Sequence, residues 1–92
     1  MLTFVEAQDV VIGSIKKASG ADANPTDKLE DVGFPSPDFI RGLRSVIVND
    51  EEVGVKQFNH KITSAALSKM KPSSTVDDVA QQVRAKATPI EA

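Results

Sequence analysis

The sequence predicts an all-α domain, built as a small four-helix bundle. Four segments place apolar residues at the three-and-four spacing of a helix face, and no segment shows a convincing strand alternation. Hydrophobic residues make up 40% and charged residues 26%, which is typical of a folded globular chain rather than a disordered one. Because 92 residues suffice for one small core and not for two, we expect residues 1–92 to form a single domain.

The first helix is predicted over residues 3–18. Thr3 and Glu6 stand at the spacing of a capping box, in which two side chains and two backbone N–H groups bond reciprocally. Gly20 follows shortly after two lysines, which is typical of a helix C-terminus. The apolar face of this helix consists of Phe4, Ala7, Val11, Ile15 and Ala18.

A long loop follows, from Ser19 to Pro37. Its composition shifts to Gly, Asp, Asn, Pro and Ser, and its apolar anchors are Leu29, Val32 and Phe34. Loops of this length without structure of their own are uncommon in compact domains and are more often functional. The loop is therefore a candidate for a functional role.

The second helix is predicted to begin at Pro37, with Ser36 as its N-cap and Asp38 as an acid in its first turn. Gly54 is the expected terminator of this helix. Its apolar face consists of Phe39, Ile40, Leu43, Val46 and Ile47.

Two further helices complete the predicted bundle. Apolar residues at helical spacing predict a third helix over about residues 56–70, which Pro72 would stop. Ser74 and Thr75 can cap a fourth helix, and residues 88–92 are expected to form a flexible tail. The apolar face of the fourth helix consists of Val76, Val79, Ala80, Val83 and Ala87.

These faces predict one buried cluster, while Ser36 is expected to be exposed. The residues expected to be buried together are Leu29, Phe39, Leu43, Phe58, Ile62, Val79 and Val83. An overlapping apolar set could line an acyl pocket between the second and third helices, although apolar residues at this spacing are usually core. That set consists of Phe34, Phe39, Phe58, Ile62 and Met70.

Composition excludes several classes of function. The chain has no cysteine and one histidine, His60, so no metal site is expected and His60 is not expected to be catalytic. A calcium-loop register over residues 49–60 fails because Val53 and His60 occupy places that need oxygen ligands. A net charge of −2 and the lack of a long apolar run argue against nucleic-acid partners and a membrane partner, and a cytoplasmic location is expected.

Four short stretches occur in a characteristic order. Residues 11–13 read Val-Ile-Gly, 27–34 read Asp-Lys-Leu-Glu-Asp-Val-Gly-Phe, 51–56 read Glu-Glu-Val-Gly-Val-Lys and 75–79 read Thr-Val-Asp-Asp-Val. This order, with a serine two residues after the second stretch, resembles the acyl carrier proteins. The resemblance covers nearly the whole chain, roughly from Phe4 to Ala87.

The resemblance implies a bundle of acyl-carrier type with a long loop between its first two helices. It also implies that Ser36 carries 4'-phosphopantetheine, and that the chain holds an acyl or related group as a thioester without being an enzyme itself. The implied partners are a phosphopantetheinyl transferase and acyl-processing enzymes of fatty acid or polyketide biosynthesis. A monomer is expected.

The sequence departs from the family around the serine. Pro35-Ser36-Pro37 replaces the family's Asp-Ser-Leu, which keeps open an alternative: an interaction module of the same fold that is not phosphopantetheinylated. Ser36 could equally serve only as the cap of the second helix. Arg41 and Arg44 put positive charge on a helix that is acidic in the family, so the docking partner is expected to present carboxylates.

Overall fold

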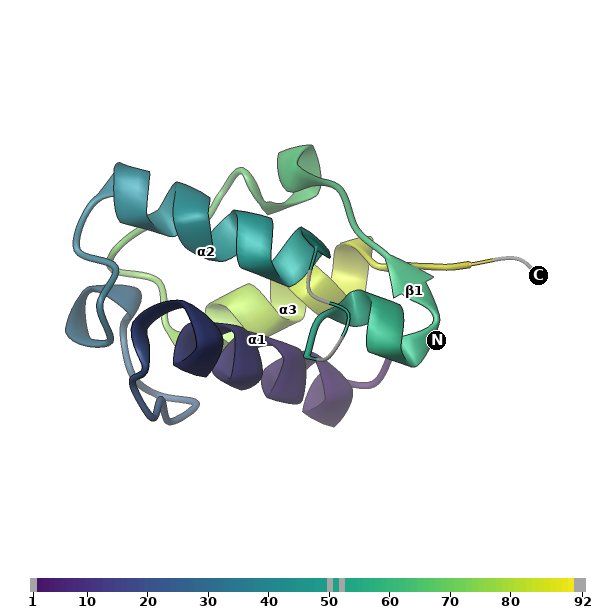
Figure 1. Ribbon diagram of the computed structural model, residues 1–92, viewed down its shortest axis with the longest axis horizontal. Helices are drawn as coiled ribbons and strands as arrows, with labels where there is room; N and C mark the ends of the chain where they lie inside the picture. Colours follow the sequence, from purple (N-terminus) through teal and green to yellow (C-terminus); the bar gives the residue numbers. More distant parts are fainter. Residues whose placement is uncertain (1, 50, 52, 91–92) are drawn as a thin grey trace.

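The computed structural model describes residues 2–49, 51 and 53–90, and this part of the chain is mostly helical (Figure 1). Within these residues three α-helices carry the fold. Short 3-10 helices and strand β1 lie between them, and strand β2 follows the last helix. In chain order the elements are α1 Phe4–Ser19, η1 Leu29–Asp31, α2 Pro37–Asn49, η2 Val55–Phe58, β1 His60–Lys61, η3 Ser64–Leu67, α3 Val76–Lys86 and β2 Thr88–Pro89.

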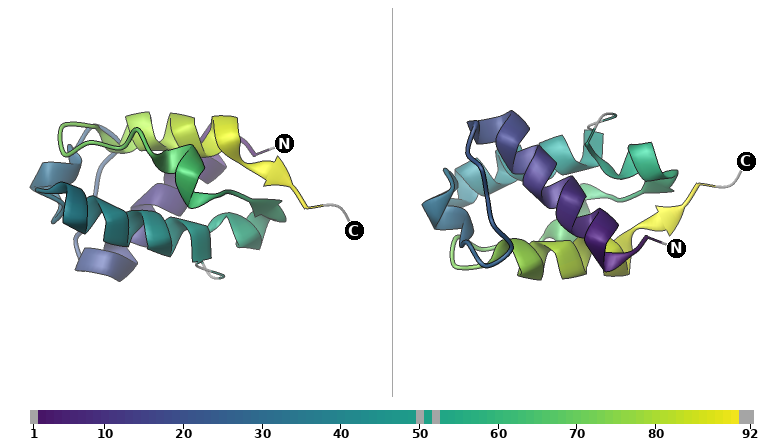
Figure 2. Two further views of the ribbon diagram at one scale, coloured as in Figure 1. Left: turned by 90° about the horizontal axis from the view of Figure 1, so that it is seen from above. Right: turned by 90° about the horizontal axis from the view of Figure 1, so that it is seen from below.

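Helix α1 is the centre of the arrangement, because it packs against both α2 and α3. Figure 2 (right) shows α1 crossing over the other two helices. Its buried side is closely packed: a Cβ built on Gly13 would lie 2.8 Å from Cβ of Val53, in the segment that follows α2. The fully buried side chains include Val10, Val11, Ile15, Leu29, Ile40, Leu43, Ile47, Leu67, Val76 and Val79.

Both ends of α1 form as the sequence predicts, and α3 begins after Thr75, one of its two expected caps. Thr3 and Glu6 make the capping box at the start of α1, and Gly20 takes the left-handed conformation, with φ +77°, at its end. Thr75 and Asp78 make a second capping box at the start of α3. Both boxes satisfy first-turn N–H groups that a helix leaves without an internal partner.

The structure confirms the all-α class but not the four-helix bundle. The predicted helix over residues 56–70 is wrong: this segment contains η2, β1 and η3, and Asn59 between the first two has φ +57°. Positive φ at a non-glycine residue breaks a helix, and Asn is among the residues that best tolerate it. Successive short turns still bury apolar side chains from residues 55–70, namely Val55, Ile62, Leu67 and Met70.

Two other boundaries differ from the sequence prediction. Helix α2 ends at Asn49, five residues before the expected terminator Gly54; Asp50 lies outside the described residues. Part of the expected tail is strand β2, which pairs antiparallel with β1, and the Ile90 N–H donates to the Asn59 carbonyl at 2.8 Å. Residues 91 and 92 of that tail lie outside the described part of the chain.

Candidate functional site

The candidate site is the junction between the long loop and α2, where Ser36 stands. The loop is fixed to the start of α3 by backbone hydrogen bonds: the Leu29 N–H donates to the Ser74 carbonyl and the Val76 N–H donates to the Asp27 carbonyl, each at 2.9 Å. Lys28 and Thr75 form an isolated antiparallel bridge at the same place. The loop therefore has an ordered conformation: its length lets it reach from α1 to the start of α3 before it returns to α2.

A second attachment holds the loop to the end of α1, just before Ser36. The Ser19 hydroxyl lies 3.0 Å from the Val32 carbonyl oxygen, and a Cβ on Gly33 would lie 2.9 Å from the Ser19 Cβ. Gly33 has φ +103°, a conformation that side-chain-bearing residues rarely adopt. This turn lets the Phe34 N–H donate to the Leu29 carbonyl at 2.9 Å and places the Phe34 ring in the core.

Sequence reasoning missed Ser19 as part of this junction. It was assigned to the loop by composition, whereas the structure makes it the last residue of α1. Its hydroxyl also lies 3.0 Å from the Ile15 carbonyl, one turn earlier, which is the usual back-bonding position of a helical serine. The signal that could have found it is a small hydroxyl residue placed just before the glycine stop of a helix.

Ser36 is half-buried, not exposed as expected, and it lies directly before α2 at the N-cap position. The Ile40 N–H donates to the Ser36 carbonyl at 3.1 Å, the first bond of the helix. The Ser36 hydroxyl makes no hydrogen bond within the part of the chain that the structure describes. The side-chain cap expected of this serine is therefore not formed, and its hydroxyl remains available as a nucleophile.

The backbone at the start of α2 is also open. Among the described residues no acceptor is paired with the N–H of Asp38 or of Phe39, at the second and third positions of the helix. Pro37 occupies the first position, where its missing N–H costs nothing. Free N–H groups at the positive end of a helix favour a nearby phosphate, so the junction fits a phosphodiester on Ser36.

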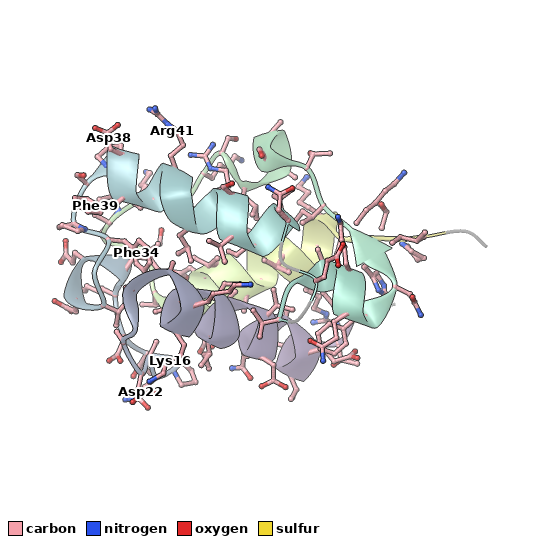
Figure 3. All side chains as sticks on the ribbon, in the orientation of Figure 1. Lys16, Asp22, Phe34, Asp38, Phe39 and Arg41 are labelled. Atoms are coloured by element: carbon pink, nitrogen blue, oxygen red, sulfur yellow. The ribbon has the colours of Figure 1, made fainter. Side chains whose placement is uncertain are left out.

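The charged groups of the first turns of α2 lie on the outer side of that helix. Arg41 Nη2 lies 3.5 Å from Asp38 Oδ1, and both side chains are largely exposed, as Figure 3 shows. Arg44 is not exposed as expected: it is half-buried, and its Nε is buried without a hydrogen-bond partner in the described structure. Of the two arginines, Arg41 is the one available for docking.

The expected core cluster forms with one exception. Leu29, Leu43, Ile62, Val79 and Val83 are buried, and Phe58 is partly buried against them. Phe39 is wrong as a core prediction, because 57% of it is exposed. The buried face of α2 is formed by Ile40, Leu43 and Ile47, and Phe39 stands about 100° around the helix from Ile40.

The remaining sequence candidates take structural roles. Phe34, Ile62 and Met70, considered as pocket-lining residues, are core side chains. His60 lies in strand β1 rather than on a helix; it is buried, and its Nδ1 lies 2.7 Å from the Phe58 carbonyl oxygen. Within residues 2–49, 51 and 53–90, no group of three or more His, Cys, Asp or Glu side chains is placed to hold a metal ion.

Comparisons with known proteins identify no relative. No family model, curated protein or solved structure matches the chain. Across the described residues, the longest and most apolar helices still fall short of what a membrane crossing requires.

Proposed function

We propose that the protein is an acyl carrier protein-like domain that carries 4'-phosphopantetheine on Ser36. The observation that carries this proposal is the free Ser36 hydroxyl at a loop-to-helix junction whose loop is fixed both to the end of α1 and to the start of α3. In the modification step, the Ser36 oxygen attacks the phosphorus of the phosphopantetheine arm of coenzyme A. The serine proton is lost, 3',5'-adenosine diphosphate leaves and a phosphodiester forms.

Different residues of the junction would contact the group and hold the loop that presents it. The N–H groups of Asp38 and Phe39 are positioned to stabilise the phosphodiester charge, and the ties from Ser19 and Ser74 hold the loop against the helices. The bound arm supplies the thiol on which an acyl or related group would be held as a thioester. The chain itself supplies presentation, and no catalytic role is proposed for its residues.

The alternative proposal is an interaction module with this fold that is not modified. Phe39 favours it, because a largely exposed aromatic ring three residues after Ser36 is typical of a docking surface. Pro35 and Pro37 favour it too, since they stand where the resemblance implies residues that a transferase recognises.

The test is the intact mass of the purified full chain after incubation with coenzyme A and a broad-specificity phosphopantetheinyl transferase. The carrier proposal expects a mass increase equal to one phosphopantetheine group in the wild type. Ser36→Ala should abolish it, and Ser73→Ala, which removes an exposed hydroxyl before α3, should not. Modification only in a Pro35→Asp/Pro37→Leu variant would instead support the unmodified interaction module.

A further inference from the structure

A groove lies between η3 and α3, away from the Ser36 junction. It has a volume of about 400 Å³ and is lined by Thr63, Ala66, Ser68 and Lys69 on one side and by Gln82 and Lys86 on the other. Figure 2 (left) shows η3 lying between α2 and α3. The volume lies within the range of small-molecule sites in proteins.

The groove carries two lysines, Lys69 and Lys86, whose charges no described residue pairs with. Residues 53–76, which include η3, contain four lysines and no Asp or Glu. Asp77 and Asp78, the acids that follow this segment, lie in the first turn of α3, whereas Gln82 and Lys86 lie in its later turns. The groove is therefore suited to an anion despite the net negative charge of the chain.

Uncharged polar groups in the groove also lack partners. Gln82 Oε1 is buried without a hydrogen bond from the described residues, and a buried acceptor without a donor is destabilising. The Thr63 hydroxyl accepts a hydrogen bond from the Ala66 N–H at 3.3 Å, which leaves its proton free to donate. The Ser68 hydroxyl makes no hydrogen bond in this part of the chain.

We propose that this groove binds a small phosphorylated ligand that also bears an N–H or O–H donor, of the chemical class of a mononucleotide. The Lys69 and Lys86 ammonium groups pair with the phosphate, and the Thr63 and Ser68 hydroxyls donate to its oxygens. The ligand's donor group bonds Gln82 Oε1, which is buried in the free protein, once the Gln82 side chain turns toward the groove. This site is independent of any modification of Ser36, because none of its lining residues belongs to that junction.

The test is a titration of the isotopically labelled full chain with adenosine monophosphate, adenosine or inorganic phosphate, followed by NMR amide shifts. Adenosine monophosphate should give saturable shifts confined to residues 63–69 and 82–86, with weaker binding of phosphate and none of adenosine. Lys69→Gln/Lys86→Gln should weaken adenosine monophosphate binding by at least about tenfold, because two charge-assisted contacts are lost.

Matched variants distinguish specific binding in the groove from non-specific attraction of the ligand to surface lysines. Lys56→Gln/Lys71→Gln removes the same charge from exposed positions outside the groove and should change the affinity by less than about twofold. Gln82→Leu should weaken adenosine monophosphate binding and leave phosphate binding unchanged. Absence of saturable shifts, equal losses in the two lysine variants, or unchanged adenosine monophosphate affinity in Gln82→Leu would each overturn the proposal.

Discussion

Phe34 and Phe39 lie on either side of Ser36 and have opposite environments (Figure 3). Phe34 is 3% exposed and belongs to the core, whereas Phe39 is 57% exposed. Phe34→Ala should lower the free energy of unfolding by about 3–5 kcal/mol, because it empties a filled core position. Phe39→Ala should change it by less than about 0.5 kcal/mol. Urea unfolding of both variants measures the difference, and comparable losses would contradict the assigned burial.

The capping box of α1 predicts a dependence of stability on pH. The Thr3 N–H donates a hydrogen bond to the Glu6 carboxylate at 2.9 Å, and this bond lowers the pKa of Glu6 below its ordinary value of 4.5. A hydrogen bond with the Thr3 side chain lowers the pKa further, and the charge of His60 contributes less. A carboxyl whose pKa is lower in the folded state than in the unfolded state stabilises the fold at pH values above its unfolded-state pKa. This stabilisation is lost as the pH falls through the folded-state pKa. The wild type should therefore exceed Glu6→Gln in unfolding free energy at neutral pH.

That difference should shrink as pH falls from the ordinary pKa of Glu6 through its lower folded-state pKa. Below both values the carboxyl is protonated in the folded and unfolded states alike. Urea unfolding of the two proteins at neutral pH and at about pH 3 measures it. A difference that stays constant across this range would show that the charge of Glu6 plays no part in the cap.

Residue-level features differed in how well they could be predicted from sequence. The pair Thr3 with Glu6 and the cap Thr75 could be located because capping depends on spacing within one turn. The exposure of Phe39 could not be predicted, because it depends on which side of α2 meets α1. Ser36 was correctly placed at the N-cap position, but the freedom of its hydroxyl is a matter of side-chain geometry that spacing leaves undetermined.

At the scale of elements, Thr75 links the long loop to α3. Its hydroxyl accepts from the Asp78 N–H at 3.2 Å, and its backbone bridges Lys28 of the loop. Thr75→Ala should lower the free energy of unfolding by about 1 kcal/mol, the usual loss for an N-cap. Thr26→Ala, an exposed loop position without a side-chain hydrogen bond in the described structure, is the matched control. Equal effects in chemical denaturation would refute the capping role.

Helix α2 presents Arg41 to solvent in the second turn after Ser36, so charge reversal there tests docking. Arg41→Glu should leave stability nearly unchanged, because its ion pair with Asp38 is exposed, and should weaken binding to a partner that presents carboxylates. Arg84→Glu, on exposed α3 surface, is the control. Titration against a phosphopantetheinyl transferase at low and moderate salt measures both variants. Unchanged affinity without salt dependence in Arg41→Glu would remove this face of α2 from docking.

At the scale of the whole molecule, the helices whose ends carry local capping signals could be predicted from the sequence. The structure of residues 55–70 could not, because tertiary contacts determine it. The apolar spacing of residues 55–70 fits a helix, but successive turns bury a different set from that segment: Leu67 enters the core and Ala65 stays exposed. Asn, His, Thr and Ser give this segment only modest helix propensity. The pairing of β1 with β2 joins residues nearly thirty positions apart, so no local pattern could reveal it.

The most direct test of the central claim is to locate the modification by peptide mass. After treatment with coenzyme A and a broad-specificity transferase, cleavage after lysine and arginine releases residues 29–41, a peptide in which Ser36 is the only Ser or Thr. The account predicts that this peptide gains the mass of one phosphopantetheine group and that no other peptide does. A fully treated chain in which the 29–41 peptide keeps its unmodified mass, while a known carrier protein in the same reaction is modified, would contradict it.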